Sequence, residues 1–403
     1  MLNLLDLLNL LIYFMLLTLV TFFAVLGILV LVHEFGHFVV ARRAGVKVEE
    51  FGLGLPPRAI GFYKTPEGKW RRLGLKTKTA STTIWSLNWV PLGGFVKIKG
   101  EEGGSANEPD SFAAQGVFRR IWIISAGVTM NIILAAILMA ISLGIGSPQL
   151  INEQSLHFGA RIREVEIRIL EVLAESPAHQ SGLEVADSII TVDGQNFSKI
   201  EELQNYFDER VGKEVTLSIK RKTELLEKKV VPQILTQTNR GGLGVALVQT
   251  GFVSYPWYSS PVYGVIETFE MIGGVIYGFY LIIANLIVSQ QLIGEIYGPV
   301  GIAGLIGDAA RLGFLYVLQF TAVLSVIIAV INFLPFPALD GGRVFFLLIE
   351  AIRKKPVNQK FETAMHNLGF ALLMVLVVIV TFRDIARVSS GFLNWWQKIS
   401  GLF

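Results

Sequence analysis

The chain has 403 residues, of which 52% are hydrophobic and 17% are charged, and its mean hydropathy is +0.55. This composition is typical of a polytopic membrane protein with room for one soluble domain. The net charge of +3 is too small to indicate a nucleic-acid partner. The absence of cysteine excludes disulfides and cysteine-bound zinc, so any bound metal needs His, Asp or Glu ligands.

The first apolar stretch, from about Tyr13 to Val40, ends in a His-Glu-x-x-His pattern. Its part from Phe14 to Val32 has no charged residue and is long enough to span a bilayer. On a helix, His33 and His37 share one face and can bind one metal, while Glu34 can act as a base on water beside it. A metal site at membrane depth implies hydrolysis inside the membrane. We expect this segment to be retained, since no basic residue precedes it as in a signal peptide.

The loop that follows, residues 42–120, is rich in Lys and Arg. Within it, Pro91–Lys99 contains Gly93, Gly94 and Phe95 ahead of an alternating segment, so the backbone can bend and then extend. Such an exposed edge could pair with an extended substrate. An ordinary amphipathic hairpin fits the pattern equally well, and the residues themselves leave both interpretations open.

A second span is expected from about Ile121 to Ile145, and the segment after it, about Gln154 to Val248, has a soluble composition. Its periodicity predicts strands at Arg163–Ile169, Asp187–Gly194 and Val215–Arg221, and helices at Ser176–Leu183 and Lys199–Arg210. This order resembles a PDZ domain, a fold that binds extended peptides by strand addition and often captures a C-terminal carboxylate. The alternative is a small α/β spacer without a ligand.

Two further spans are expected, from about Phe314 to Phe333 and from about Leu368 to Phe382. A fifth apolar stretch, Val265–Val288, carries Glu267, Glu270 and several glycines. We interpret it as a surface or partly inserted helix, which leaves a count of four spans.

Basic residues set the predicted orientation. Lys and Arg concentrate in residues 42–120 and in the loop between the third and fourth spans, whereas residues 1–40 contain none. The positive-inside rule places both loops in the cytoplasm and the N-terminus outside. With four spans, the segment between the second and third spans also faces outward.

The stretch Asn332–Arg343 lies at the cytoplasmic end of the third span, on the same side as the histidine pair. Two prolines break the helix there, which membrane proteins tolerate where the backbone lines a cavity. Asp340 follows the break and can point back at a metal. An Asp-Gly loop turn is the plainer alternative.

Together, the His33–His37 pattern and Asn332–Gly342 resemble the site-2 protease family of intramembrane zinc metalloproteases. The Gly93-Gly94-Phe95 segment and the PDZ-like insert resemble its bacterial RseP-type branch, although some members carry two PDZ domains in tandem and this chain shows one. The resemblance implies that Zn2+ is bound by His33, His37 and Asp340 and that Glu34 is the catalytic base and later the proton donor. It further implies that the substrate is bound by Asn332, Gly93, Gly94 and Phe95, and that Gly298–Ile302 is structural.

The implied fold is an α-helical polytopic membrane protein with about four transmembrane helices, an inserted α/β PDZ-like domain and a membrane-associated β-hairpin. The expected divisions are residues 1–153, 154–250, 251–310 and 311–403. The implied location is the bacterial cytoplasmic (inner) membrane, with the PDZ-like domain outside and the active site near the cytoplasmic side. The implied partners are the lipid bilayer, single-span membrane proteins such as pre-trimmed anti-sigma factors or remnant signal peptides, and a peptide or C-terminus at the PDZ-like domain.

Two other functions are consistent with parts of the sequence. A membrane metal-ion transporter would repeat polar residues across several spans or show inverted repeats, yet the second and fourth spans hold almost no ionisable residue. A non-catalytic PDZ scaffold would tolerate a broken His-Glu-x-x-His pattern, and this one is intact. Both alternatives are therefore weaker than the protease.

Overall fold

The computed structural model describes residues 4–73, 80–101, 107–151, 156–221, 224–235, 240–288 and 296–400. The chain divides into two compact units, residues 1–139 with 265–403, and residues 140–264. Small parts of the predicted 154–250 and 251–310 segments, including residues 289–295, lie outside the described ranges.

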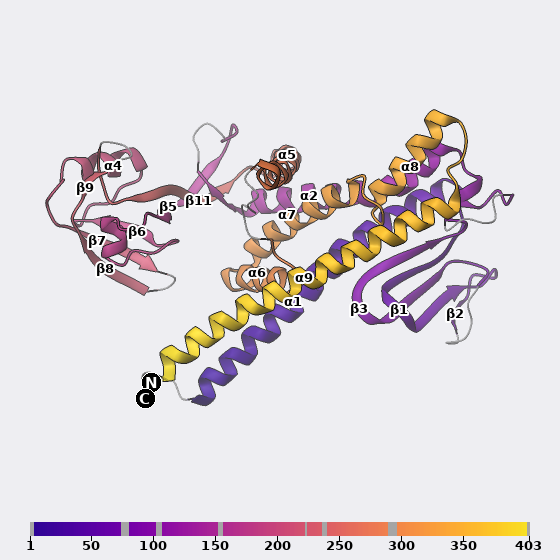
Figure 1. Cartoon of the computed structure of the whole chain (residues 1–403), viewed down its shortest axis with the longest axis horizontal. Helices are drawn as coiled ribbons and strands as arrows, with labels where there is room; N and C mark the ends of the chain where they lie inside the picture. The colour runs from indigo at the N-terminus through magenta and orange to yellow at the C-terminus, as the bar shows by residue number, and fades with distance from the viewer. Residues whose placement is uncertain are drawn as a thin grey trace. The chain divides into compact units, whose positions relative to one another are not determined.

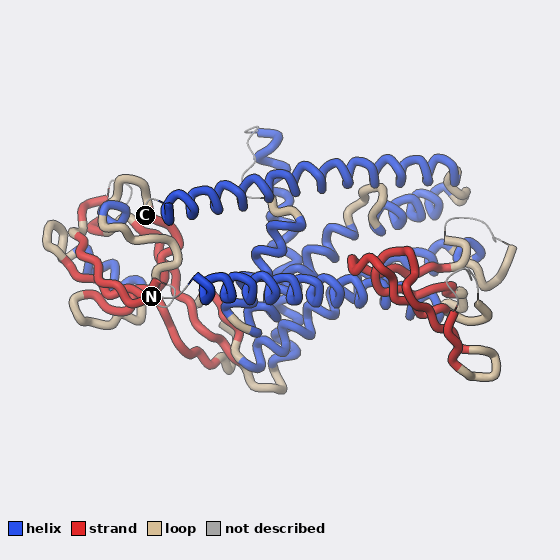
Figure 2. Tube along the Cα trace, turned by 90° about the horizontal axis from the view of Figure 1, so that it is seen from below, coloured by secondary structure: helices blue, strands red, loops and turns tan. Residues whose placement is uncertain are grey.

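Long helices dominate the first unit (Figures 1 and 2). They are α1 (Leu4–Arg43), α2 (Val117–Ile145), α5 (Ser260–Val288), α6 (Pro299–Leu312), α7 (Phe314–Phe333), α8 (Asp340–Arg353) and α9 (Gln359–Ser400), with a short 3-10 turn η1 (Phe112–Ala114). The last residues of α2 and the first of α5 belong to the second unit.

Five helices of the described residues are long and apolar enough to cross a membrane. Four of them, α1, α2, α7 and α9, coincide with the predicted spans. The fifth, α5, covers the stretch for which we predicted a surface or partly inserted helix. Because it meets the same criteria of length and hydropathy, the count of four spans stays a prediction.

Small residues let the helices of the first unit approach closely. A Cβ atom at Gly36 of α1 would lie 2.4 Å from the carbonyl oxygen of Ala126 on α2. A Cβ atom at Gly307 of α6 would lie 2.4 Å from Oγ1 of Thr18 on α1. Such contacts are how helices pack in lipid, where the hydrophobic effect between helices is weak.

The loop after α1 folds into a sheet of β1 (Val48–Lys64), β2 (Trp70–Leu73) and β3 (Ile84–Ile98) in the order β2-β1-β3. Residues 50–53 of β1 pair with residues 94–97 of β3 on one side and with residues 84–87 on the other. Within the described residues, the segment Gly94–Lys97 therefore has no strand on its outer side. The predicted extended segment at Pro91–Lys99 is a strand, and its association with a membrane stays a prediction.

The second unit contains a six-stranded antiparallel sheet in the order β4-β11-β5-β6-β7-β8. Its elements are β4 (Ser147–Leu150), β5 (Arg161–Val172), α3 (Pro177–Gln180), β6 (Ser188–Val192), α4 (Ile200–Asp208), β7 (Val215–Arg221), β8 (Glu224–Val230), β9 (Gln233–Leu235), β10 (Arg240–Gly242) and β11 (Val245–Ser254). The five elements predicted here are all present. The sequence analysis did not predict β4, β8, β9, β10 or β11.

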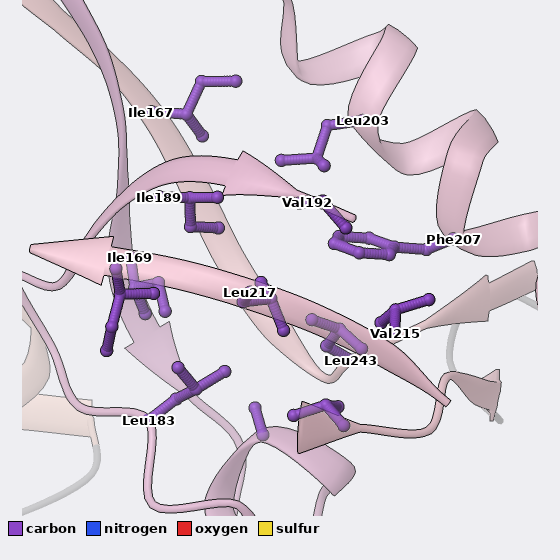
Figure 3. Packing of buried hydrophobic residues seen from close by; sticks show 13 residues of the cluster. Ile167, Ile169, Leu183, Ile189, Val192, Leu203, Phe207, Val215, Leu217 and Leu243 are labelled. Atoms are coloured by element: carbon purple, nitrogen blue, oxygen red, sulfur yellow. The ribbon is translucent and has the colours of Figure 1, made fainter. Parts of the chain in front are cut away.

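Apolar alternation explains the core of the second unit (Figure 3). Val215, Leu217 and Ile219 point to one side of β7 and are fully buried, as expected for period-two alternation. Leu203 and Phe207, one turn apart on α4, cover this face of the sheet.

An ion pair between buried Asp187 and partly exposed Arg221 also holds this unit together. Asp187 is 1% exposed and accepts hydrogen bonds from Nε and Nη2 of Arg221, each at 2.7 Å, and from the backbone N–H of Glu184 at 2.8 Å. Burial raises the pKa of Asp187, but the hydrogen bonds from Arg221 and Glu184 and the positive charges of Arg221 and Lys228 together lower it by more. The pKa of this carboxyl therefore lies below its ordinary value.

We predict that Asp187→Asn destabilises residues 140–264 by about 2 kcal/mol at pH 7, because Arg221 loses its charged partner. A carboxyl with a lowered pKa stabilises the fold above its unfolded pKa of about 3.9, and this contribution disappears as the pH falls below that value. The difference in stability between the variant and the wild type should therefore shrink towards pH 3. Hydrogen-exchange mass spectrometry of the full-length protein measures the stability of residues 140–264.

The matched control is Lys229→Gln, which breaks the exposed pair with Glu214 and should change stability by less than about 0.5 kcal/mol. Equal exchange protection in the Asp187 and Lys229 variants would contradict the structural role of the buried pair.

Candidate metal centre

Three ligand atoms from two distant parts of the chain meet at one point. Nε2 of His33 lies 3.2 Å from Nε2 of His37, its neighbour one turn along α1. Oδ2 of Asp340, the first residue of α8, lies 3.1 Å from the first of these nitrogens and 3.3 Å from the second. The structure thus brings the three predicted ligands together, with all ligand atoms within 4.8 Å of one another.

Groups on α2 orient the two imidazoles. Nδ1 of His37 donates to the carbonyl oxygen of Ile123 at 2.9 Å, which leaves Nε2 free to face the centre. The amide of Asn131, a fully buried residue, lies 3.3 Å from Nδ1 of His33. A histidine that binds metal through Nε2 carries its hydrogen on Nδ1. If the side-chain amide of Asn131 is rotated by 180°, its Oδ1 accepts a hydrogen bond from this Nδ1–H of His33. Without that rotation, Oδ1 of Asn131 has no hydrogen-bond partner.

Gly127 on α2 provides the space in front of the imidazoles. A Cβ atom there would lie 2.4 Å from Nε2 of His37 and 2.7 Å from Cε1 of His33. Any side chain at this position would therefore collide with the nitrogen that faces the centre.

The third ligand is positioned by a break between two helices. Helix α7 ends at Phe333, and Pro335 and Pro337 lie in the turn before α8 begins at Asp340. A Cβ atom at Gly341 would lie 2.3 Å from the carbonyl oxygen of Phe333. The start of α8 therefore packs so closely against the end of α7 that only glycine fits at position 341.

Helix α9 holds this turn in place. The backbone N–H of Ala338 donates to Nδ1 of His366 at 2.8 Å. Ala338 has a φ of 80°, a left-handed conformation that is unfavourable for alanine and that this hydrogen bond helps to maintain. A Cβ atom at Gly369 would lie 2.3 Å from the carbonyl oxygen of Pro337. The fourth predicted span thereby fixes the turn that carries Asp340.

A cavity of about 380 Å³ opens in front of the three ligands. Glu34, Phe95, Val96, Arg343 and His366 are among the residues that line it. Arg343 forms an ion pair with Glu101 in the cavity wall. His33, His37 and Asp340 themselves line this cavity, so the centre faces an open space.

The predicted substrate-binding residues have different positions. Phe95 lines the cavity, and a Cβ atom at Gly94 would lie 3.6 Å from Cγ of Glu34, so this strand passes directly beside the acid. Gly93 lies against Val30 of α1. Asn332 is partly buried at the end of α7 and is not among the lining residues, so its contact with substrate stays a prediction.

Sequence reasoning missed Gly127, Asn131 and His366. A single Asn within an apolar span is a signal for function that was available for Asn131. Nothing local marks Gly127 or His366, because their roles depend on contacts with α1 and with the turn at Ala338.

The donor set fits zinc. Two histidine nitrogens and one carboxylate oxygen form the kind of three-ligand site that catalytic zinc uses, with a fourth position open towards the cavity. The carbonyl oxygen of Ile123 accepts from Nδ1 of His37 and so fixes the tautomer that leaves Nε2 free, a further requirement for binding metal through that atom.

Known proteins are similar in sequence to most of this chain. The sequence model described as Peptidase family M50 matches residues 21–376. A Clostridium acetobutylicum protein that bears the provisional name of zinc metalloprotease is 31% identical over 363 residues, which cover 89% of this chain and 94% of its own. Zinc metalloprotease RasP of Oceanobacillus iheyensis is 27% identical over 455 residues, which cover 92% and 99%.

Among solved structures, the PDZ domain of the SdrC-like protein from Listeria monocytogenes matches part of the chain with 20% sequence identity and a TM-score of 0.20. The match covers 22% of this chain and 92% of that one.

We predict that Gly127→Ala lowers the zinc content of the purified protein severely, because the added methyl group lies within 3 Å of both imidazoles. The measurement is metal stoichiometry by inductively coupled plasma mass spectrometry. Gly27→Ala on α1 is the control, since nothing lies within 4 Å of its added Cβ atom, and it should bind zinc like the wild type. Full zinc occupancy in the Gly127 variant would show that the metal is bound elsewhere.

Proposed function

Because this chain belongs to peptidase family M50, the site-2 protease family, and is a zinc metalloprotease, we propose that it hydrolyses peptide bonds within transmembrane segments of single-span membrane proteins. The observation that carries the proposal is the meeting of His33, His37 and Asp340 at the end of a helix long and apolar enough to span a bilayer. We further propose pre-trimmed anti-sigma factors or remnant signal peptides as substrates. Transport and scaffolding are disfavoured by the peptidase family and the intact motif.

We propose that His33, His37 and Asp340 hold the zinc ion and that Glu34 is the acid–base group. Zinc, when bound, supplies a Lewis acid that polarises the scissile carbonyl and makes water more acidic. Glu34 lines the cavity next to the ligands, where its carboxylate can take a proton from the attacking water. The same carboxyl can then give that proton to the leaving amine.

The edge of β3 provides a surface on which a substrate could be held in an extended conformation. A transmembrane helix hides its peptide bonds in its own hydrogen bonds, so cleavage requires local unwinding. Among the described residues, no strand lies on the outer side of Gly94–Val96, and this segment passes beside Glu34. An unwound substrate could pair with this edge and so keep its scissile bond extended at the site.

The second unit supports peptide capture. Along residues 245–248, β11 pairs with β5 on one side, and within the described residues no strand covers the other side. The loop before it contains Gly244, whose φ of +75° and close approach to Ser176 require glycine. We propose that a peptide or C-terminus adds to this edge as in PDZ domains. We also propose that this unit lies outside the bacterial cytoplasmic membrane and the metal centre near its cytoplasmic side, as the distribution of Lys and Arg indicates.

We predict that Glu34→Gln keeps zinc but abolishes cleavage, because glutamine is of the same size and cannot accept the proton. The rate of cleavage should fall by more than about 100-fold, which is the lower end of what a general acid–base group contributes. The assay uses reconstituted enzyme and a panel of single-span model proteins with shortened outward parts. Measurable turnover by zinc-loaded Glu34→Gln would assign the proton transfer to another group.

Strand presentation can be tested by disulfide crosslinking, because the chain has no cysteine of its own. We predict that Val96→Cys, made in the Glu34→Gln background to trap substrate, crosslinks to every second position of a cysteine-scanned model substrate. This period of two reports a strand, whereas a period near 3.6 would report a helix and contradict the proposal. Leu87→Cys, which lies on a strand paired on both sides, is the control and should show no such periodicity.

A further inference from the structure

One end of the β1–β2 hairpin combines cations and aromatic rings on a single face. Phe62 pairs with Arg72, and Lys64 pairs with Trp70. Because directly opposite residues in an antiparallel pair share a face, as do residues two apart, all four side chains point the same way. We call these four residues the basic-aromatic face. All four are exposed, with Trp70 60% exposed and Phe62 45% exposed.

The charge of this region is strongly positive. Lys69 and Arg71 flank the basic-aromatic face and are exposed, and Glu67 in the turn is the one acid between Lys64 and Trp70. Within the described residues, no ion pair involves the side chains of the four cations from Lys64 to Arg72. Their charges are therefore available to an external anion.

The same face of the sheet becomes purely apolar towards the opposite end of the strands. Trp85 pairs with Phe62, and Leu87 pairs with both Ile60 and Leu53. On this face, Leu53 and Leu87 are exposed, and so are Leu55 and Trp89 beyond them. The exposed side chains of this face thus change along the strands from Lys, Arg and Trp to Leu and Trp. Between these two ends, the rings of Trp85 and Phe51 pack against Phe38 of α1.

Contacts with α1 set the depth of the two ends. Gly93 and Gly94 lie near the apolar end of the sheet. A Cβ atom built at either glycine would lie 3.7 Å from Cγ1 of Val30 on α1. Val30 precedes Arg43, the last residue of α1, by 13 positions, or about 20 Å of helix. Figure 1 shows the sheet beside this part of α1, with β3 nearest to it and β2 farthest.

The basic end lies level with the end of α1. The backbone N–H of Val46 bonds to the carbonyl oxygen of Ala41, so β1 starts where the helix stops. Ile84 pairs with both Glu50 and Tyr63, which brings Tyr63 and its neighbour Lys64 back to the level of the start of β1. If α1 spans the bilayer, the apolar end lies at hydrocarbon depth and the basic-aromatic face lies at the headgroups.

We propose that the basic-aromatic face binds the headgroups of anionic phospholipids in the leaflet on the His33 side. The inference rests on the proposed membrane placement and not on proteolysis. Basic residues near such a surface attract anionic lipids, and Trp and Phe sit preferentially at the boundary between headgroups and chains. A free phosphate or a nucleic acid would match the charge but not the continuous apolar surface beyond it. The bound headgroups would hold the sheet, and with it the Gly94–Lys97 edge, in the membrane beside Glu34.

The test is native mass spectrometry of the full-length protein in detergent micelles, titrated with phosphatidylglycerol or phosphatidylcholine. Wild-type protein should retain phosphatidylglycerol preferentially. The double variant Lys64→Gln/Arg72→Gln should bind it roughly tenfold more weakly, since each basic residue near an anionic surface contributes a few-fold in affinity. Phosphatidylcholine binding should not change.

The control Lys213→Gln/Arg161→Gln removes one Lys and one Arg, both exposed, from the second unit and should bind like the wild type. Glu34→Gln should also bind like the wild type, so that failure of the lipid site and failure of the proposed protease chemistry are separate results. The proposal is overturned if Lys64→Gln/Arg72→Gln retains phosphatidylglycerol like the wild type or loses no more than the control. Displacement of the lipid by millimolar inorganic phosphate would likewise overturn it, because the region would then be a general anion site.

Discussion

The structure depends on bringing three ionisable side chains together in largely apolar surroundings. Such groups are costly to bury unless each polar atom has a partner. Here Oδ2 of Asp340 faces the Nε2 atoms of both His33 and His37, and each Nδ1 atom faces a polar group of α2. The glycine contacts between α1 and α2 follow from this requirement, because the polar groups of α2 reach the imidazoles only if the two helices approach closely.

The third ligand depends on elements far from it in the sequence. Asp340 stands at the start of α8, but the turn before it is held by a hydrogen bond from Ala338 to His366 of α9. Helices α1, α2, α7, α8 and α9 thus all contribute to one centre. A metal ion held by these residues, as proposed, would also tie the helices together, so that metal binding and helix packing would support each other.

Local pattern determined which parts of this arrangement could be predicted. His33, Glu34 and His37 follow from helical spacing alone, and strict alternation revealed strands such as Val215–Arg221. Asp340 required its position after the helix break together with the family resemblance. Gly127 and His366 could not be found because their importance is a tertiary contact, and β11 was missed because its residues lack a regular alternation. Asn332 was proposed by resemblance, and the structure places it outside the cavity lining.

The hairpin sheet reverses the usual distribution of polarity. In residues 84–89 of β3, the exposed residues are Trp85, Leu87 and Trp89, while Ser86 and Asn88 between them are buried. Asn88 donates to the carbonyl oxygen of Gly54 at 2.8 Å, and Arg58 donates to Glu50 at 2.9 Å on the sheltered side. Apolar side chains outside and polar ones inside are typical of strands that contact lipid. With the membrane placement proposed above, such a sheet would place a strand edge next to Glu34 while its apolar face stayed in the bilayer. A transmembrane substrate could then meet that edge by lateral diffusion, without its apolar side chains entering water.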